Sequence, residues 1–170
     1  MLIKVCAAGV LAFLCQSAMA IDDTPAEYRI KESEPQTGSH IRRDSFTGSG
    51  IPLNKRYAEL SAAQKSMLRA RYETMAPDDE PPFPVNGMMH INKSIQEGNA
   101  ILHEEGALRM VVKIDSKGDA TTVEVLSSPS EKMTKLAAAI LMLEKYKPAL
   151  CHGVACSMQF PYNADFVIRH

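Results

Sequence analysis

The sequence has no surplus of positive charge. Its 19 Lys and Arg residues face 20 Asp and Glu residues, so the formal net charge is −1 and the isoelectric point is near 6.5. A domain that binds nucleic acid usually carries a basic surplus on one face, because it neutralises phosphates. The balance of charge therefore argues against a nucleic-acid partner. A hydrophobic content of 45% and a charged content of 23% are typical of a globular protein.

The motifs of common enzyme classes are also missing. The five His residues are scattered and form no H-x-x-x-H or H-E-x-x-H pair. The sequence contains neither a G-x-S-x-G element that would present a nucleophilic Ser nor a glycine-rich phosphate loop. Glu104 and Glu105 are adjacent, so their carboxylates point in different directions and make a poor acid–base pair. We therefore expect a protein that is not an enzyme and uses no cofactor.

A long apolar run is missing as well. The N-terminal segment contains Lys4 and the apolar run Val5–Cys15, which is short against the roughly 20 residues of a membrane span. Ala18-Met19-Ala20 then supplies the small residues of a cleavage site. These features predict that residues 1–20 are a secretory signal peptide, which is removed on export. A retained inner-membrane anchor is the alternative interpretation.

Cysteine is scarce, and two of the four Cys residues lie in the predicted signal peptide. The remaining pair, Cys151 and Cys156, would meet an oxidising compartment after export, which predicts a disulfide. The alternatives are a metal site formed by Cys151, His152 and Cys156, and a redox-active pair. No second group of Cys or His ligands lies nearby, and the spacing differs from the C-x-x-C of thiol oxidoreductases.

The region before residue 82 divides into two segments. Residues 21–57 are polar and rich in turn-forming residues, and no helical or strand period is sustained, so we expect a flexible polar arm. Residues 58–81 are expected to form a helical extension and a proline-rich joint. Ser61 and Gln64 have the spacing of a capping box at the start of a helix. Pro77 predicts that this helix ends at the preceding residue.

Residues 82–170 are expected to form one domain with the order helix, strand, strand, helix, strand. Apolar periodicity predicts helices over 87–103 and from Ser130 to about Tyr146, and strands over 107–114, 120–127 and 156–168. The second helix is expected to bury Met133, Leu136, Ala137, Ile140 and Leu143.

The last strand alternates between apolar and polar residues, so one of its faces is expected to be buried. Pro161 lacks an N–H group, which favours a position at the edge of the sheet. Pairing the last strand with the first gives a three-stranded antiparallel sheet of order 2-1-3 and a right-handed crossover. Both helices then cover one face. The predicted fold class is α+β, a two-layer sandwich with an N-terminal helical extension.

Five segments follow one another between about residues 82 and 168. They are the Pro82–Pro84 entry, the Gly106–Gly118 strand and turn, the Val123–Ser128 strand, the helix and exit at Ala137–Ala139 and Tyr146–Ala149, and the Phe160–Phe166 strand. In this order they resemble the C-terminal domain of the TonB family. The resemblance implies a periplasmic module that binds outer-membrane receptors. Such a module adds a short extended segment of the receptor to its sheet as an extra strand.

The resemblance places the partner-binding edge on the last strand. The residues expected there are Met158, Gln159, Phe160, Tyr162, Asn163, Asp165 and Phe166. The partner would be an outer-membrane receptor or another envelope protein, and the membrane would be reached only through protein partners. A homodimer through the same edge is left open. The alternative is a structural or assembly protein of the envelope without a transport role, in which residues 21–60 cover the edge.

Overall fold

The computed structural model describes residues 27–29, 36–42 and 50–167 of the chain. The predicted signal peptide at residues 1–20 and much of the predicted arm lie outside these ranges. Within them, no helix has both the length and the apolar character that crossing a membrane requires.

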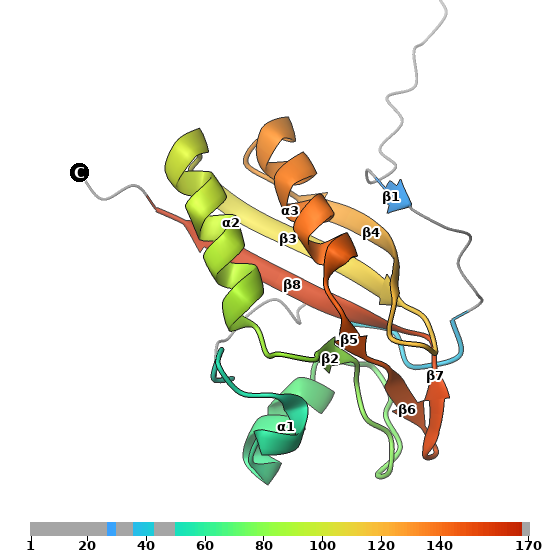
Figure 1. The fold of residues 1–170 in the computed structure, drawn as a ribbon. Coiled ribbons are helices and arrows are strands. Elements are labelled where there is room, and N and C mark those ends of the chain that lie inside the picture. Colours follow the sequence, from blue (N-terminus) through green and yellow to red (C-terminus); the bar gives the residue numbers. More distant parts are fainter. Residues whose placement is uncertain (1–26, 30–35, 43–49, 168–170) are drawn as a thin grey trace, which may run out of the picture.

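The centre of the fold is an antiparallel sheet with the strand order β1-β4-β3-β8 (Figure 1). Its strands are β1 (Glu27–Arg29), β4 (Ala120–Ser127), β3 (Gly106–Ile114) and β8 (Met158–Phe166). Helices α2 (Met89–Leu102) and α3 (Glu131–Leu143) contact each other and lie over one face of the sheet (Figure 1). The predicted mixed α+β class with an antiparallel sheet is confirmed. The sheet has four strands where three were expected, because β1 is too short for its pattern to be recognised.

The central strand β3 carries the core. Leu108, Met110, Val112 and Ile114 alternate along it and are all fully buried, as their spacing predicts. The turn to β4 depends on Gly118, which has a φ of +83°, and a Cβ at this position would overlap the Tyr146 carbonyl oxygen. Only glycine meets both requirements at no steric cost.

Helices α1 (Ala62–Arg69) and α3 begin directly after the Ser residues at which the sequence predicts their starts, Ser61 and Ser130. Helix α1 follows a complete capping box, in which the Ser61 hydroxyl accepts from the Gln64 N–H and the Gln64 side chain accepts from the Ser61 N–H. This helix ends at Arg69, about two turns before the expected end at Ala76. Gly98 of α2 lies against α3, since an added Cβ would overlap the Leu136 side chain.

Helix α3 differs from its prediction in its end and in its buried stripe. It ends at Leu143, since Tyr146–Lys147 (β5) pair with Phe83–Pro84 (β2) in a small separate sheet. Leu143 was expected to be buried, but its side chain is 79% exposed and Leu141 is fully buried instead. The stripe follows Met133, Ala137 and Leu141, which lie one above the other at a spacing of four residues.

A second, smaller apolar cluster joins the N-terminal region to the domain. It contains Tyr72, Ala149, Cys156 and Met158, with Ile41 packed against them. Ala149 and Cys156 belong to the hairpin of β6 (Ala149–Cys151) and β7 (Val154–Cys156), which also form a sheet of their own. The cluster therefore connects the helical extension, the hairpin and the start of β8.

Candidate functional site

Strand β8 is an outer strand of the central sheet, and one side of its backbone is therefore turned away from β3. Along an antiparallel strand, the backbone groups of successive residues point alternately toward the neighbouring strand and away from it. The carbonyl oxygens of Ser157 and Gln159 accept hydrogen bonds from groups outside the sheet. The outward set thus continues through Pro161, Asn163 and Asp165. Because Pro161 belongs to this set, its missing N–H interrupts no bond to β3.

The first half of this outer edge is covered by the chain itself. The Gly38 N–H donates to the Ser157 carbonyl at 3.1 Å, and the Tyr72 hydroxyl donates to the Gln159 carbonyl at 2.8 Å. The Ile41 N–H also reaches the Gln159 side-chain oxygen at 3.4 Å. Ile41 and Tyr72 form an isolated antiparallel bridge, so the covering segment is itself held in an extended form. We refer to residues 36–42 together with Tyr72 as the edge cover.

Burial holds the edge cover in place. Tyr72 is only 4% exposed, and burial raises the pKa of its hydroxyl well above the usual value for tyrosine. The hydroxyl therefore remains a donor to Gln159 throughout the physiological pH range. Gly38 lies against Met158 so closely that a Cβ would overlap the methionine methyl group. A larger residue would push this part of the cover away from the strand.

The second half of the edge, residues 163–165, is not covered by the described part of the chain. No residue in the described ranges hydrogen-bonds the outward backbone groups of Asn163 or Asp165. The Asp165 side chain is 61% exposed and pairs with Arg109 on the neighbouring strand, with 2.6 Å between Oδ1 and Nη2. Arg109 also donates to the Ala164 carbonyl at 2.8 Å. This pair braces the end of β8 from the direction of β3, and neither of its side chains bonds the outward backbone groups.

The structure separates the seven predicted edge residues into two groups. Buried side chains belong to Met158, Phe160, Tyr162 and Phe166. The backbone groups of these four residues point toward β3, so they are not available to a partner strand on the outer side. Gln159, Asn163 and Asp165 belong to the outward set, and the Gln159 carbonyl is already bonded to the edge cover. Asn163 and Asp165 remain as the predicted residues whose outward backbone groups have no hydrogen-bond partner among residues 27–29, 36–42 and 50–167.

A cavity of ≈ 100 Å³ lies where the covered and open halves meet. Pro161 and Asn163 line it from the strand. Leu53 from the loop before α1, Leu68 from α1 and Met88 at the start of α2 line it from the opposite side. The helical extension thus turns this part of a plain sheet edge into a recess with an apolar wall.

The predicted disulfide between Cys151 and Cys156 is present and joins the two strands of the β6–β7 hairpin. Both sulfur atoms are used in this bond, which excludes the alternative metal site built from them. His152 and Gly153 form the tip with φ values of 51° and 78°, the left-handed conformation of a tight hairpin turn.

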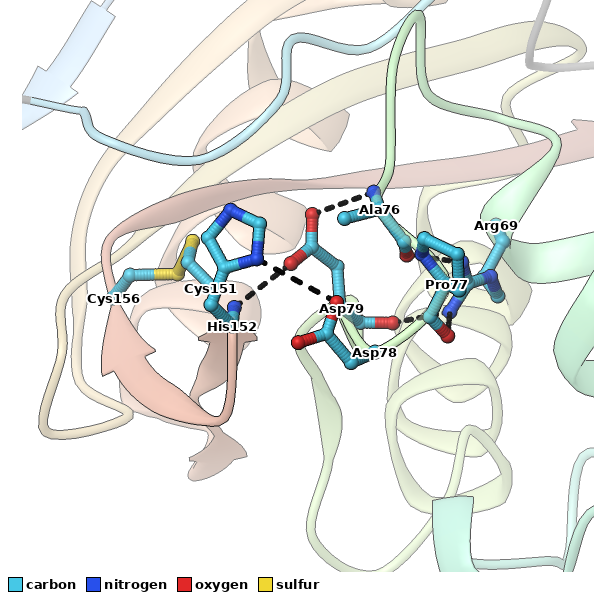
Figure 2. A network of polar contacts seen from close by, with 8 residues as sticks. All are labelled: Arg69, Ala76, Pro77, Asp78, Asp79, Cys151, His152 and Cys156. Carbon is cyan, nitrogen blue, oxygen red and sulfur yellow. Dashed lines mark hydrogen bonds and ion pairs between the residues drawn. A yellow bond between two sulfur atoms is a disulfide. The ribbon is translucent and has the colours of Figure 1, made fainter.

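The hairpin tip is tied to the proline-rich joint by Asp79 (Figure 2). One Asp79 carboxylate oxygen accepts from the His152 N–H and the other accepts from the Ala76 N–H, both at 2.9 Å. Burial acts to raise the pKa of Asp79, but the two backbone donors, together with the charges of His152 and Arg69, outweigh it and hold the pKa below its usual value. Arg69 donates to the carbonyl oxygens of Ala76, Pro77 and Asp79, which fixes the loop after α1.

Asp78, Asp79 and His152 bring ligand-type atoms within 4.8 Å of one another. The His152 ring nitrogen lies 3.5 Å from an Asp78 oxygen, an ion pair when the histidine is protonated. Both Asp79 oxygens are already engaged by the backbone, so this group serves to fasten the joint to the hairpin. The joint is also fastened by Glu80 and Leu150, which exchange two backbone hydrogen bonds of 2.9 Å.

Sequence reasoning missed the edge cover and the cavity. The hydrogen bond from Tyr72 to the last strand has no local signal in the sequence. Residues 36–42 show no helical or strand period, and only Gly38 and Ile41 of this segment hydrogen-bond to Ser157 and Gln159. Comparison of the chain with models of known protein families, with curated proteins and with solved structures found no match.

Proposed function

We propose that this chain is a periplasmic protein-binding module that takes up an extended segment of an outer-membrane receptor, or of another envelope protein, as an additional strand beside β8. The observation that carries the proposal is the open half of the β8 edge, where no described residue bonds the outward groups of Asn163 and Asp165. Unpaired strand edges are templates for strand addition, in which backbone hydrogen bonds supply much of the affinity.

The resemblance to the TonB C-terminal domain supports the same proposal. In this interpretation β4, β3 and β8 with helices α2 and α3 correspond to the two-layer module of that family, with its strands in the order second, first, last. The helical extension and the edge cover are additions of this chain. The proposed route to the periplasm is export with cleavage after Ala20, and N-terminal sequencing of the periplasmic protein should then begin at Ile21.

The edge cover determines the register of the docked strand. Ser157 and Gln159 are taken, so pairing begins at Pro161 and extends toward Asp165. Pro161 offers only a carbonyl, whereas Asn163 and Asp165 each offer an N–H and a carbonyl. The docked segment is therefore short. At its end nearest the cavity it meets Pro161, which offers a carbonyl acceptor but no N–H donor.

Photo-crosslinking in cells tests the proposal. A photoreactive amino acid at Asp165, on the open edge, should capture an extended segment of an envelope protein. The matched control is Leu126 on β4, whose side chain is 47% exposed and lies away from β8. Absence of any product from Asp165, or equal products from both positions, would refute strand addition at this edge.

The edge cover favours a second candidate, a structural or assembly protein of the envelope with no transport role. In that case the cover shields β8 as a permanent part of the fold. A crosslink from Asp165 to a second copy of the chain would indicate a homodimer through the same edge. Loss of the protein with no change in receptor-dependent uptake, but with altered envelope integrity, would support the structural role.

A further inference from the structure

The cavity beside Pro161 and Asn163 is lined mainly by apolar residues. We propose that it binds one aliphatic side chain of the docked strand, and so selects segments that carry Val, Ile, Leu or Met at a single position. This inference rests on the proposed function, because it requires a strand at the β8 edge. It adds the side-chain class by which the module distinguishes one extended segment from another.

The cavity lies where a docked strand would direct a side chain. Pro161 and Asn163 belong to the outward set of β8 and line the cavity directly. The side chains of a strand alternate between the two faces of a sheet. A strand paired with Asn163 and Asp165 therefore sends alternate side chains toward the face covered by the helices. Met88 and Asn92 of the α2 region form the wall on that face.

The walls of the cavity are mostly apolar. Its apolar lining includes Ile51, Leu53, Leu68, Met88, Phe160 and Pro161. An apolar cavity of about 150 Å³ accommodates a benzene molecule, so a cavity of ≈ 100 Å³ suits a smaller aliphatic group. Burying such a group against these walls is favoured by the hydrophobic effect, and its fit to them gives discrimination by size.

Three polar residues also line the cavity, and they define the competing occupant. Asn92 accepts a hydrogen bond of 2.8 Å from the Tyr162 hydroxyl, so its oxygen is already used within the fold. Arg71 and Asn163 are the other two. Arg71 already has an interaction partner in the structure, but its positive charge makes an acidic side chain the competing occupant. The apolar walls outnumber these groups, which favours the aliphatic occupant.

Selection from a phage-displayed library of random linear peptides on the full exported chain provides the test. Peptides that crosslink to a photoreactive residue at Asp165 are synthesised, and each residue is replaced in turn by Ala. We expect one aliphatic position at which the Ala peptide binds about tenfold more weakly or worse. Smaller effects are expected at the other positions, where backbone pairing dominates.

Variants of the protein test whether the aliphatic side chain of the peptide occupies the cavity. Leu53 is 44% exposed, so Leu53→Trp can fill the cavity with little disturbance of the core. It should weaken binding of the aliphatic peptide about tenfold and leave binding of its Ala version unchanged. Leu126→Trp, at a position exposed to a similar extent on β4, should change neither.

The outcomes distinguish the inference from the proposed function. Peptides that crosslink to Asp165 but show no aliphatic preference, or an acidic one, would overturn the inference alone. The same holds if Leu53→Trp binds the aliphatic peptide as tightly as Leu126→Trp does. If no peptide crosslinks to Asp165, strand addition fails and the inference fails with it.

Discussion

Replacing Tyr72 by Phe is expected to loosen the edge cover while leaving the packing of the ring intact. The substitution removes only the hydroxyl, which donates to the Gln159 carbonyl at 2.8 Å. The ring stays in the apolar cluster with Ala149, Cys156 and Met158. The change therefore isolates the one side-chain hydrogen bond that ties the extension to the outer backbone of β8.

The size of the effect follows from the environment of this bond. A typical intramolecular hydrogen bond contributes about 0.5–1.5 kcal/mol, and a buried acceptor left without a partner costs about 1–3 kcal/mol. Tyr72 is buried, whereas Gln159 is half-buried and can regain water once the cover loosens. We expect a loss of about 1 kcal/mol in the free energy of unfolding, together with faster amide exchange at Gly38, which bonds the neighbouring Ser157 carbonyl.

Urea denaturation followed by circular dichroism measures the loss, and hydrogen exchange measured by NMR reports on Gly38. The matched control is Tyr57→Phe, because Tyr57 is also a buried ring at 6% exposure, and no described residue accepts a hydrogen bond from its hydroxyl. That variant should stay within about 0.5 kcal/mol of the original protein. Equal stability of the two variants, with unchanged exchange at Gly38, would refute the role of Tyr72 as a clamp on the edge.

Three further predictions concern the core, the hairpin and the pH dependence. Gly98→Ala should destabilise by about 1–2 kcal/mol in urea denaturation, because its methyl group overlaps Leu136; in a Leu136→Ala background the same change should stabilise. The exported protein should have an intact mass 2 Da below the reduced value, and replacing Cys151 and Cys156 by Ser should cost about 2 kcal/mol; two freely alkylated thiols would contradict this. Burial raises the pKa of Tyr57 to about 12, so stability that is fully present below the usual value of 10.0 should decline as the pH rises toward 12. Parallel absorbance and circular dichroism titrations test this, and unfolding that is complete before pH 10 would contradict it.

Local patterns accounted for the regular elements of the fold. The alternation of Leu108, Met110, Val112 and Ile114 predicted β3, and the capping box at Ser61 predicted the start of α1. These signals act over a few residues and depend on the period of burial. The disulfide was predicted from the expected export and from the two cysteines that remain beyond the predicted signal peptide, which is a compositional argument and needs no knowledge of the fold.

Long-range contacts set the features that the sequence did not reveal. Helix α3 stops at Leu143 because Tyr146 is recruited to pair with Pro84, a partner more than sixty residues away. The edge cover depends on single bonds from Gly38 and Tyr72 to a strand near the other end of the chain. The cavity exists only where four separate segments meet. A local sequence pattern carries no information about such contacts, so they are seen only in the structure.

The short strand β1 has a consequence for self-association. It occupies the outer side of β4 opposite Thr122–Glu124, at the far end of the sheet from β8. A sheet that is free at both ends can add copies of itself without limit, and this is the geometry of fibril growth. β1 is itself the outer strand at this end, but it is only three residues long, and a very short edge strand is a poor template for a further copy. Any pairing between copies is therefore expected to use the nine-residue strand β8 at the other end of the sheet.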